Sequence, residues 1–181
     1  MGSDFTEHPL SSKVAYAGRL LTLKEDTVRL PDGGTATREY VLHPGAVVII
    51  PLFDDGNLLL EHQYRYPLRR HFLELPAGKI EPNEAPESTA RRELLEETGY
   101  VAREWGYLTT LHPCVGYSDE RIELFLARGL DFEDHPGEDD EFIETLSLSV
   151  DAALEKVFAQ EITEAKTILG IFWADRIRRG L

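Results

Sequence analysis

The sequence has little cysteine and no long apolar run. Its 181 residues include one cysteine, Cys114, which cannot form a disulfide within the chain, so nothing suggests a secreted, disulfide-stabilised fold. The longest apolar run, residues 46–53, contains Pro51 and is far shorter than a membrane-spanning helix. We therefore expect a cytoplasmic protein with no membrane segment.

Basic residues are also few. Lysine and arginine number 19 against 33 aspartates and glutamates, which gives a formal net charge of −14. A nucleic-acid-binding surface needs a basic stripe, so this balance argues against a nucleic-acid partner. It does not exclude an anionic small substrate, because bound metal ions can reverse the local field.

The length fits one domain with a modest extension, and 42% hydrophobic residues are enough to bury a core. Residues 1–44 are expected to form a small antiparallel β extension. In residues 45–181 the order of elements predicts an α/β (α+β) fold, with a mixed β-sheet sandwiched between helices. Strands are predicted at 14–17, 19–23, 27–30, 35–42, 46–52, 58–64, 71–75, 105–111, 121–127 and 142–146, with a loop at 76–78, and helices at 87–98, 150–160 (Ser149 as N-cap) and 164–178 (Thr163 as N-cap).

One predicted helix carries a cluster of acidic side chains. Glu93, Glu96 and Glu97 are spaced i, i+3 and i+4, which places their carboxylates on one face. Like charges at these spacings destabilise a helix, so the cluster needs either open solvent or a compensating cation. Oxygen ligands without neighbouring His or Cys favour Mg²⁺ or Mn²⁺ over zinc. A solvated acidic face is the alternative explanation.

The flanks of this helix favour a site. Ala90 and Leu94 form a packing stripe that leaves the glutamates facing elsewhere, and Gly99 follows as the residue that ends the helix. The loop at 76–78 precedes the helix, so a loop and a helix together present carboxylates beside an exposed backbone turn.

The spacing of this segment resembles the Nudix box. Residues 78–100 read GKIEPNEAPESTARRELLEETGY, with Gly78, Glu84, the run 92–97 and Gly99 at the fixed positions of that pattern; Tyr100 stands where an aliphatic residue is more usual. The resemblance implies the Nudix fold and metal-dependent hydrolysis of a pyrophosphate bond.

The resemblance also implies roles for individual residues. Glu93 and Glu97 would be the principal metal ligands, with Glu96 sharing a further ion and Ala77 offering its backbone carbonyl. Glu96 and Glu97, with Arg92 tying the glutamates down, are also the candidate catalytic residues within the box. Two further positions would support the site: Glu84, read as a brace between loop and helix, and Gly78, which lets the backbone turn sharply and leaves room for metal or substrate.

Beyond the box, most of the chain resembles the ADP-ribose pyrophosphatase branch, whose members are typically homodimers with N-terminal strands that reach across to the partner subunit. On this resemblance Arg65 would grip the substrate diphosphate, and Arg38 would be offered by the partner subunit. Glu141 would be the loop glutamate that binds metal or acts as the base, with Glu138 and Asp139 as alternatives. The arginines could instead form surface salt bridges, and the acidic loop could simply be solvated.

One position departs from that branch. Val115 stands where the branch commonly has a proline, and because proline fixes φ and removes a donor, its loss changes the loop. Three hypotheses follow: an ADP-ribose pyrophosphatase, a broader nucleoside-diphosphate-sugar hydrolase accepting for example GDP-mannose or ADP-glucose, or a Nudix-fold module that binds a nucleotide without cleaving it.

Overall fold

The computed structural model describes residues 4–133 and 142–180, and the chain divides into two compact units. One unit comprises the chain up to Pro44 together with Cys114–Arg121; the other comprises Gly45–Pro113 and the chain from Ile122 onward. The N-terminal extension thus includes a segment from the middle of the sequence. Among the described residues, no helix combines the length and the apolar character needed to cross a membrane.

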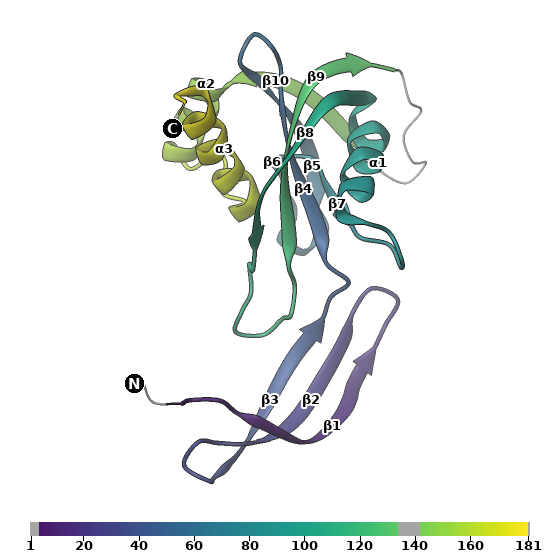
Figure 1. Ribbon diagram of the computed structural model, residues 1–181, viewed down its shortest axis with the longest axis vertical. Coiled ribbons are helices and arrows are strands. Elements are labelled where there is room, and N and C mark those ends of the chain that lie inside the picture. Colours follow the sequence, from purple (N-terminus) through teal and green to yellow (C-terminus); the bar gives the residue numbers. More distant parts are fainter. Residues whose placement is uncertain (1–3, 134–141, 181) are drawn as a thin grey trace. The chain divides into compact units, whose positions relative to one another are not determined.

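The first unit is an antiparallel sheet of β1 (His8–Ala17), β2 (Thr22–Arg29) and β3 (Thr35–Leu42), in that order (Figure 1). The segment Cys114–Arg121 joins β3 through two backbone hydrogen bonds, from Val41 N to Tyr117 O (2.9 Å) and from Asp119 N to Val41 O (3.3 Å). These contacts explain why the two parts of the sequence form one unit.

The prediction of two short strands at 19–23 and 27–30 was wrong, because β2 is one continuous strand. The predicted break falls on the charged residues 24–26. In the sheet, however, Glu25 lies opposite Lys13 of β1 and forms an ion pair with it at 2.8 Å. Cross-strand partners of opposite charge stabilise such a position in a strand.

The second unit is a mixed sheet covered by helices on both faces (Figure 1). In the described residues the order β10-β5-β4-β9-β8 forms the main path; β4 and β9 are parallel and the other pairs antiparallel, with β6 added to β5 and β7 to β4. The elements are β4 (Ala46–Leu52), β5 (Asn57–Arg65), a 3₁₀ turn (Tyr66–Leu68), β6 (Arg70–Glu74), β7 (Ala77–Lys79), α1 (Pro86–Thr98), β8 (Tyr100–Leu111), β9 (Ile122–Phe132), β10 (Ile143–Ser149), α2 (Val150–Phe158) and α3 (Ala165–Arg178).

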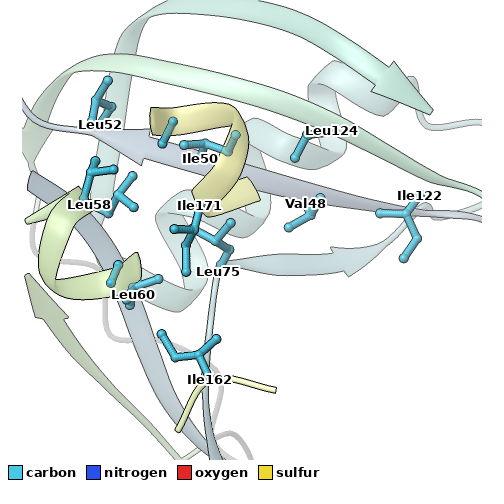
Figure 2. Close-up of a cluster of buried hydrophobic side chains, with 13 residues drawn as sticks. Val48, Ile50, Leu52, Leu58, Leu60, Leu75, Ile122, Leu124, Ile162 and Ile171 are labelled. Atoms are coloured by element: carbon cyan, nitrogen blue, oxygen red, sulfur yellow. The ribbon is translucent and has the colours of Figure 1, made fainter. Parts of the chain in front are cut away.

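The central strand β4 separates two hydrophobic cores, because its side chains alternate between the two faces of the sheet. Val47 and Ile49 face the core shared with α1, whereas Val48 and Ile50 face the core shared with α2 and α3. All four are fully buried, as expected of a strand covered on both faces. Figure 2 shows the second core, in which Leu75 and Ile171 join the side chains of β4 and β5. The predicted sandwich of a mixed sheet between helices is confirmed.

The sheet splits between β4 and β5. The two strands pair only at Leu52 and Leu58, beyond which β5 pairs with β6 and β4 pairs with β7. The predicted loop at 76–78 is therefore partly wrong: Ala77 and Gly78 pair with β4 as strand β7. This arrangement places β7, the strand that precedes α1, along the split.

The sequence predicted the N-terminal cap of α2 correctly but not that of α3. The Ser149 side chain accepts a hydrogen bond from Ala152 N and caps α2, as predicted. At α3 the predicted cap was wrong: the Glu164 side chain accepts hydrogen bonds from Lys166 N and Thr167 N, whereas the hydroxyl of Thr163 accepts a hydrogen bond from Arg70. A carboxylate also suits the positive end of the helix dipole.

Candidate active site

Helix α1 presents its acidic face beside the split in the sheet. Ala90 and Leu94 are fully buried in the core with β4, so the helix packs by the predicted stripe. Gly99 ends the helix with a left-handed φ of 72° and donates its N–H to Leu95 O at 2.8 Å. The helix is thus fixed at its C-terminal end and along its packed face.

Arg92 is the centre of the ionic network on α1. Its Nη1 lies 2.8 Å from Glu96 Oε2 and 3.0 Å from Glu93 Oε1. Its Nε and Nη2 each donate to Glu84 at 3.0 Å. These hydrogen bonds, foremost the one with Glu84, raise the pKa of Arg92 further above its usual range. One permanent positive charge thus holds three carboxylates.

Glu84 connects the loop before α1 to the helix itself. It accepts hydrogen bonds from the Thr89 hydroxyl at 2.8 Å and from Glu81 N at 3.3 Å, besides the two from Arg92. The hydrogen bonds from Arg92 are the main reason that the pKa of Glu84 falls to about 2. Its contacts have the form of the loop-to-helix brace expected from the sequence.

Two glutamates of α1 meet the backbone of β7. Glu97 Oε2 accepts the Ala77 N–H at 3.0 Å. A Cβ built on Gly78 would overlap the Glu93 carboxylate, so only glycine leaves that carboxylate its space. Glu93 and Glu97, one turn apart, therefore lie against two consecutive backbone units.

A second ionic cluster lies at the start of the split, and sequence reasoning missed most of it. Arg65 of β5 forms a two-point hydrogen-bonded ion pair with Glu74 of β6, Nε to Oε1 at 2.8 Å and Nη2 to Oε2 at 2.9 Å. Lys166 of α3 contacts the same Glu74 Oε2. Glu61 lies directly opposite Glu74 in the sheet.

Both strand glutamates of this cluster are only 2% exposed. Burial raises the pKa of Glu61 to about 8, against the opposing charge of Lys166. Burial also acts to raise the pKa of Glu74, but the hydrogen bonds from Arg65 and the charge of Lys166 outweigh it, so this pKa falls below its usual range. Glu74 is therefore the anion of the cluster.

The two clusters meet at Glu97. Glu61 shares a hydrogen bond with Glu97, whose charge also acts on Arg65. Arg65, which the family resemblance assigns to the substrate diphosphate, thus lies near Glu97 of the box. The signal that could have revealed Glu61 is a charged residue directly after the apolar run 58–60, in a strand with both faces covered.

Two predicted residues lie outside the described part of the second unit. Arg38 lies in the first unit, where it forms an ion pair with Glu7 and its side chain is 47% exposed. Glu141, like its alternatives Glu138 and Asp139, lies outside the described residues.

The donor set suits Mg²⁺ or Mn²⁺, since the α1 face and β7 offer only oxygen ligands. As placed, no three Asp, Glu, His or Cys side chains within residues 4–133 and 142–180 converge on one point. Mg²⁺ ordinarily binds through one or two carboxylates together with waters and substrate phosphates. Glu93 and Glu97, with the space kept by Gly78, fit that mode of binding.

Comparison with known proteins identifies the class. The NUDIX domain model matches residues 42–167, and the chain belongs to the Nudix family. A second model, the nucleoside diphosphate sugar hydrolase N-terminal domain, matches residues 7–41, which contain β1, β2 and all of β3 except Leu42. The resemblance read from residues 78–100 is confirmed.

Individual relatives resemble this chain over nearly its whole length. The chain is 38% identical over 167 residues to an ADP-ribose pyrophosphatase from Bacillus subtilis (91% of this chain, 90% of the relative) and 37% identical over 173 residues to a methanol dehydrogenase activator from Bacillus methanolicus (94% of each). A crystal structure of an ADP compounds hydrolase superposes with a TM-score of 0.89 at 22% identity, covering 99% of this chain and 98% of that one. That last match supports the fold.

Proposed function

We propose that this protein hydrolyses the pyrophosphate bond of a nucleoside diphosphate sugar, ADP-ribose first among them, to a nucleoside monophosphate and a sugar phosphate. The observation that carries the proposal is that Arg65 lies close enough to Glu97 to feel its charge, while Glu97 and Glu93 lie one turn apart on α1 against the backbone of β7. The relative from Bacillus subtilis named an ADP-ribose pyrophosphatase supports the choice of substrate class.

The reaction requires water to attack a phosphorus atom that is shielded by negative oxygens, so the site must offset charge and orient the water. Mg²⁺, with Mn²⁺ as a substitute, would supply charge neutralisation and a water of lowered pKa when bound. Glu93 and Glu97 would hold it, with Glu96 and the Ala77 carbonyl as further oxygen ligands.

The protein's own groups would divide the remaining tasks. Arg92 keeps the box carboxylates in place and Glu84 keeps Arg92 in place. Arg65 uses two of its five N–H groups on Glu74 and its side chain is 42% exposed, which leaves donors for the diphosphate. Glu141 is proposed as the loop residue that orients or deprotonates the water.

We further propose that the protein works as a homodimer in which Arg38 of each subunit serves the site of the other. Strand β1 is exposed over its whole length and carries apolar side chains there, namely Leu10, Val14 and Tyr16 at 48%, 57% and 60% exposure. Such an apolar edge supports an interface. Sedimentation at equilibrium measures the subunit number, and a monomer at micromolar concentration would remove this part of the proposal.

A broader nucleoside-diphosphate-sugar hydrolase is the second candidate, and Val115 favours it. This residue is 82% exposed in the turn where the branch commonly has proline. A loop without that proline is less constrained, so it discriminates less sharply between bases or sugars.

The test is turnover of ADP-ribose, ADP-glucose, GDP-mannose and UDP-glucose with Mg²⁺, with products resolved by chromatography. AMP and ribose 5-phosphate formed with a strong preference for ADP-ribose support the first candidate. Comparable turnover of several nucleotide sugars supports the second. No turnover of any would leave the nucleotide-binding module as the explanation and overturn both.

A further inference from the structure

The first turns of α3 dock on the end of β6, next to the proposed site. The Thr167 hydroxyl accepts the Leu75 N–H at 2.9 Å, and both residues are buried. A Cβ on Gly170 would overlap the Leu75 side chain, so helix and strand are in close contact there. Figure 2 shows Ile171 of α3 beside Leu75 in the same core.

Two buried glutamates lie close to this contact. Glu61 and Glu74 are cross-strand neighbours, and both are almost fully buried. A buried carboxylate needs a paired cation. Among the described residues, the cations that act on both carboxylates are Arg65 and Lys166, and the Lys166 side chain is only 12% exposed.

Glu74 divides its two oxygens unequally between these cations. Oε1 accepts from Arg65 Nε, whereas Oε2 accepts from both Arg65 Nη2 and the Lys166 ammonium. Lys166 is itself held by Glu164 at 3.1 Å, the residue that caps α3. The ammonium is thus fixed by the helix end and placed on the oxygen that Arg65 also uses.

We propose that Lys166 is a positioning residue for diphosphate recognition: by sharing the Glu74 carboxylate with Arg65, it leaves the Arg65 guanidinium available to the substrate. This inference rests on the proposed function, since it assumes that Arg65 binds the diphosphate. Without the ammonium, the whole charge of Glu74 falls on Arg65, which then binds Glu74 more tightly and the substrate less well.

The expected signature is a change in KM. Arg65 is proposed to bind the diphosphate equally in the ground and transition states, so weakening it raises KM and leaves kcat nearly unchanged. Lys166→Met should raise KM for ADP-ribose about tenfold, which corresponds to roughly one charge-assisted hydrogen bond. Lys166→Arg keeps the charge and should restore most of the affinity.

Two comparison variants separate positioning from mere stability. Thr167→Val removes a polar contact between α3 and Leu75, the residue after β6, without touching a charge. Lys156→Met removes a lysine of α2 that forms an ion pair with Glu161, beyond the end of that helix. Both should keep the wild-type KM. If Thr167→Val raises KM as much as Lys166→Met, or if Lys166→Met lowers kcat alone, the positioning role is wrong.

The double variant Arg65→Ala/Lys166→Met gives an independent check. If Lys166 acts through Arg65, KM of the double variant equals that of Arg65→Ala, whereas independent roles predict that the two effects multiply. If Lys166→Met does not fold, the same comparison is made with Lys166→Arg, whose displaced charge should give a smaller rise in KM that also disappears in the Arg65→Ala background.

The outcome remains informative if the proposed function fails. Where the wild-type protein turns over no nucleotide sugar, calorimetry compares the binding of inorganic pyrophosphate with Mg²⁺ to the wild type and to Lys166→Met. About tenfold weaker binding by the variant supports the positioning role. Equal binding, or none by either protein, overturns it.

Discussion

Arg92 donates two hydrogen bonds of 3.0 Å to Glu84, one to each carboxylate oxygen, and so ties α1 to the loop before it. Two parallel N–H···O bonds between a guanidinium and a carboxylate are strong and geometrically specific. They also keep the guanidinium in position for Glu93 and Glu96.

This pair predicts a pH-dependent stability. The pKa of folded Glu84 is about 2, below the value of about 4.3 for an unperturbed glutamate. A depressed pKa contributes stability that is fully present above pH 4.3 or so and is lost as pH falls toward about 2. Glu84→Gln should lower the free energy of unfolding by about 1.5–3 kcal/mol at neutral pH, and by progressively less below about pH 4. Urea titrations of both proteins across pH measure the difference, and a gap that stays constant down to pH 3 would contradict the assignment.

Gly78→Ala should abolish most activity while the chain still folds. The added Cβ overlaps the Glu93 carboxylate, which must leave its place against β7. Gly78 is not one of the described glycines with a positive φ. The loss of activity therefore comes from this contact and not from backbone strain. The matched control is Gly116→Ala, where a Cβ meets nothing within 4 Å. Turnover and thermal unfolding are measured on both, and a Gly78→Ala protein with wild-type turnover would remove Glu93 from the proposed ligands.

Local sequence signals determine much of this fold. The apolar run 46–52 matches β4 residue for residue, and Gly99 ends α1 where its left-handed conformation requires. Strand ends that depend on a distant partner were missed. Strand β8 begins at Tyr100, five residues before its predicted start, because Tyr100 pairs with Phe132 at the far end of β9. No pattern within either segment indicates that register.

The same distinction holds for the site. The box residues 93, 96 and 97 lie on one helix, so spacing alone predicts that Glu93 and Glu97 share a face. Lys166 and Glu74 are 92 residues apart and meet only because α3 docks on β6. Nothing in the sequence near Lys166 indicates that contact.

Gly170→Ala tests this docking of α3. In a free helix the change would stabilise by about 1 kcal/mol, because alanine is the better helix former. Here the Cβ meets Leu75, which is 1% exposed and cannot move aside without disturbing its core. Overpacking of this kind costs about 1–3 kcal/mol, so the net effect should be destabilising. Thermal and urea unfolding give the sign, and a stabilised variant would show that α3 lies less close to β6.

Glu97→Gln is the most direct test of the proposed catalytic carboxylates. Glutamine keeps the size of the side chain and an oxygen that can accept the Ala77 N–H, so the fold should remain. It removes the negative charge that a divalent ion needs, so turnover should fall by several orders of magnitude, and added Mg²⁺ should not restore it. Glu87→Gln is the matched control: it lies on the same helix, about half exposed, and pairs only with Arg91 in the described contacts. Its turnover should match that of the wild type. Loss of folding by Glu97→Gln would indicate that this glutamate is structural, and turnover close to wild type would exclude it from the chemistry.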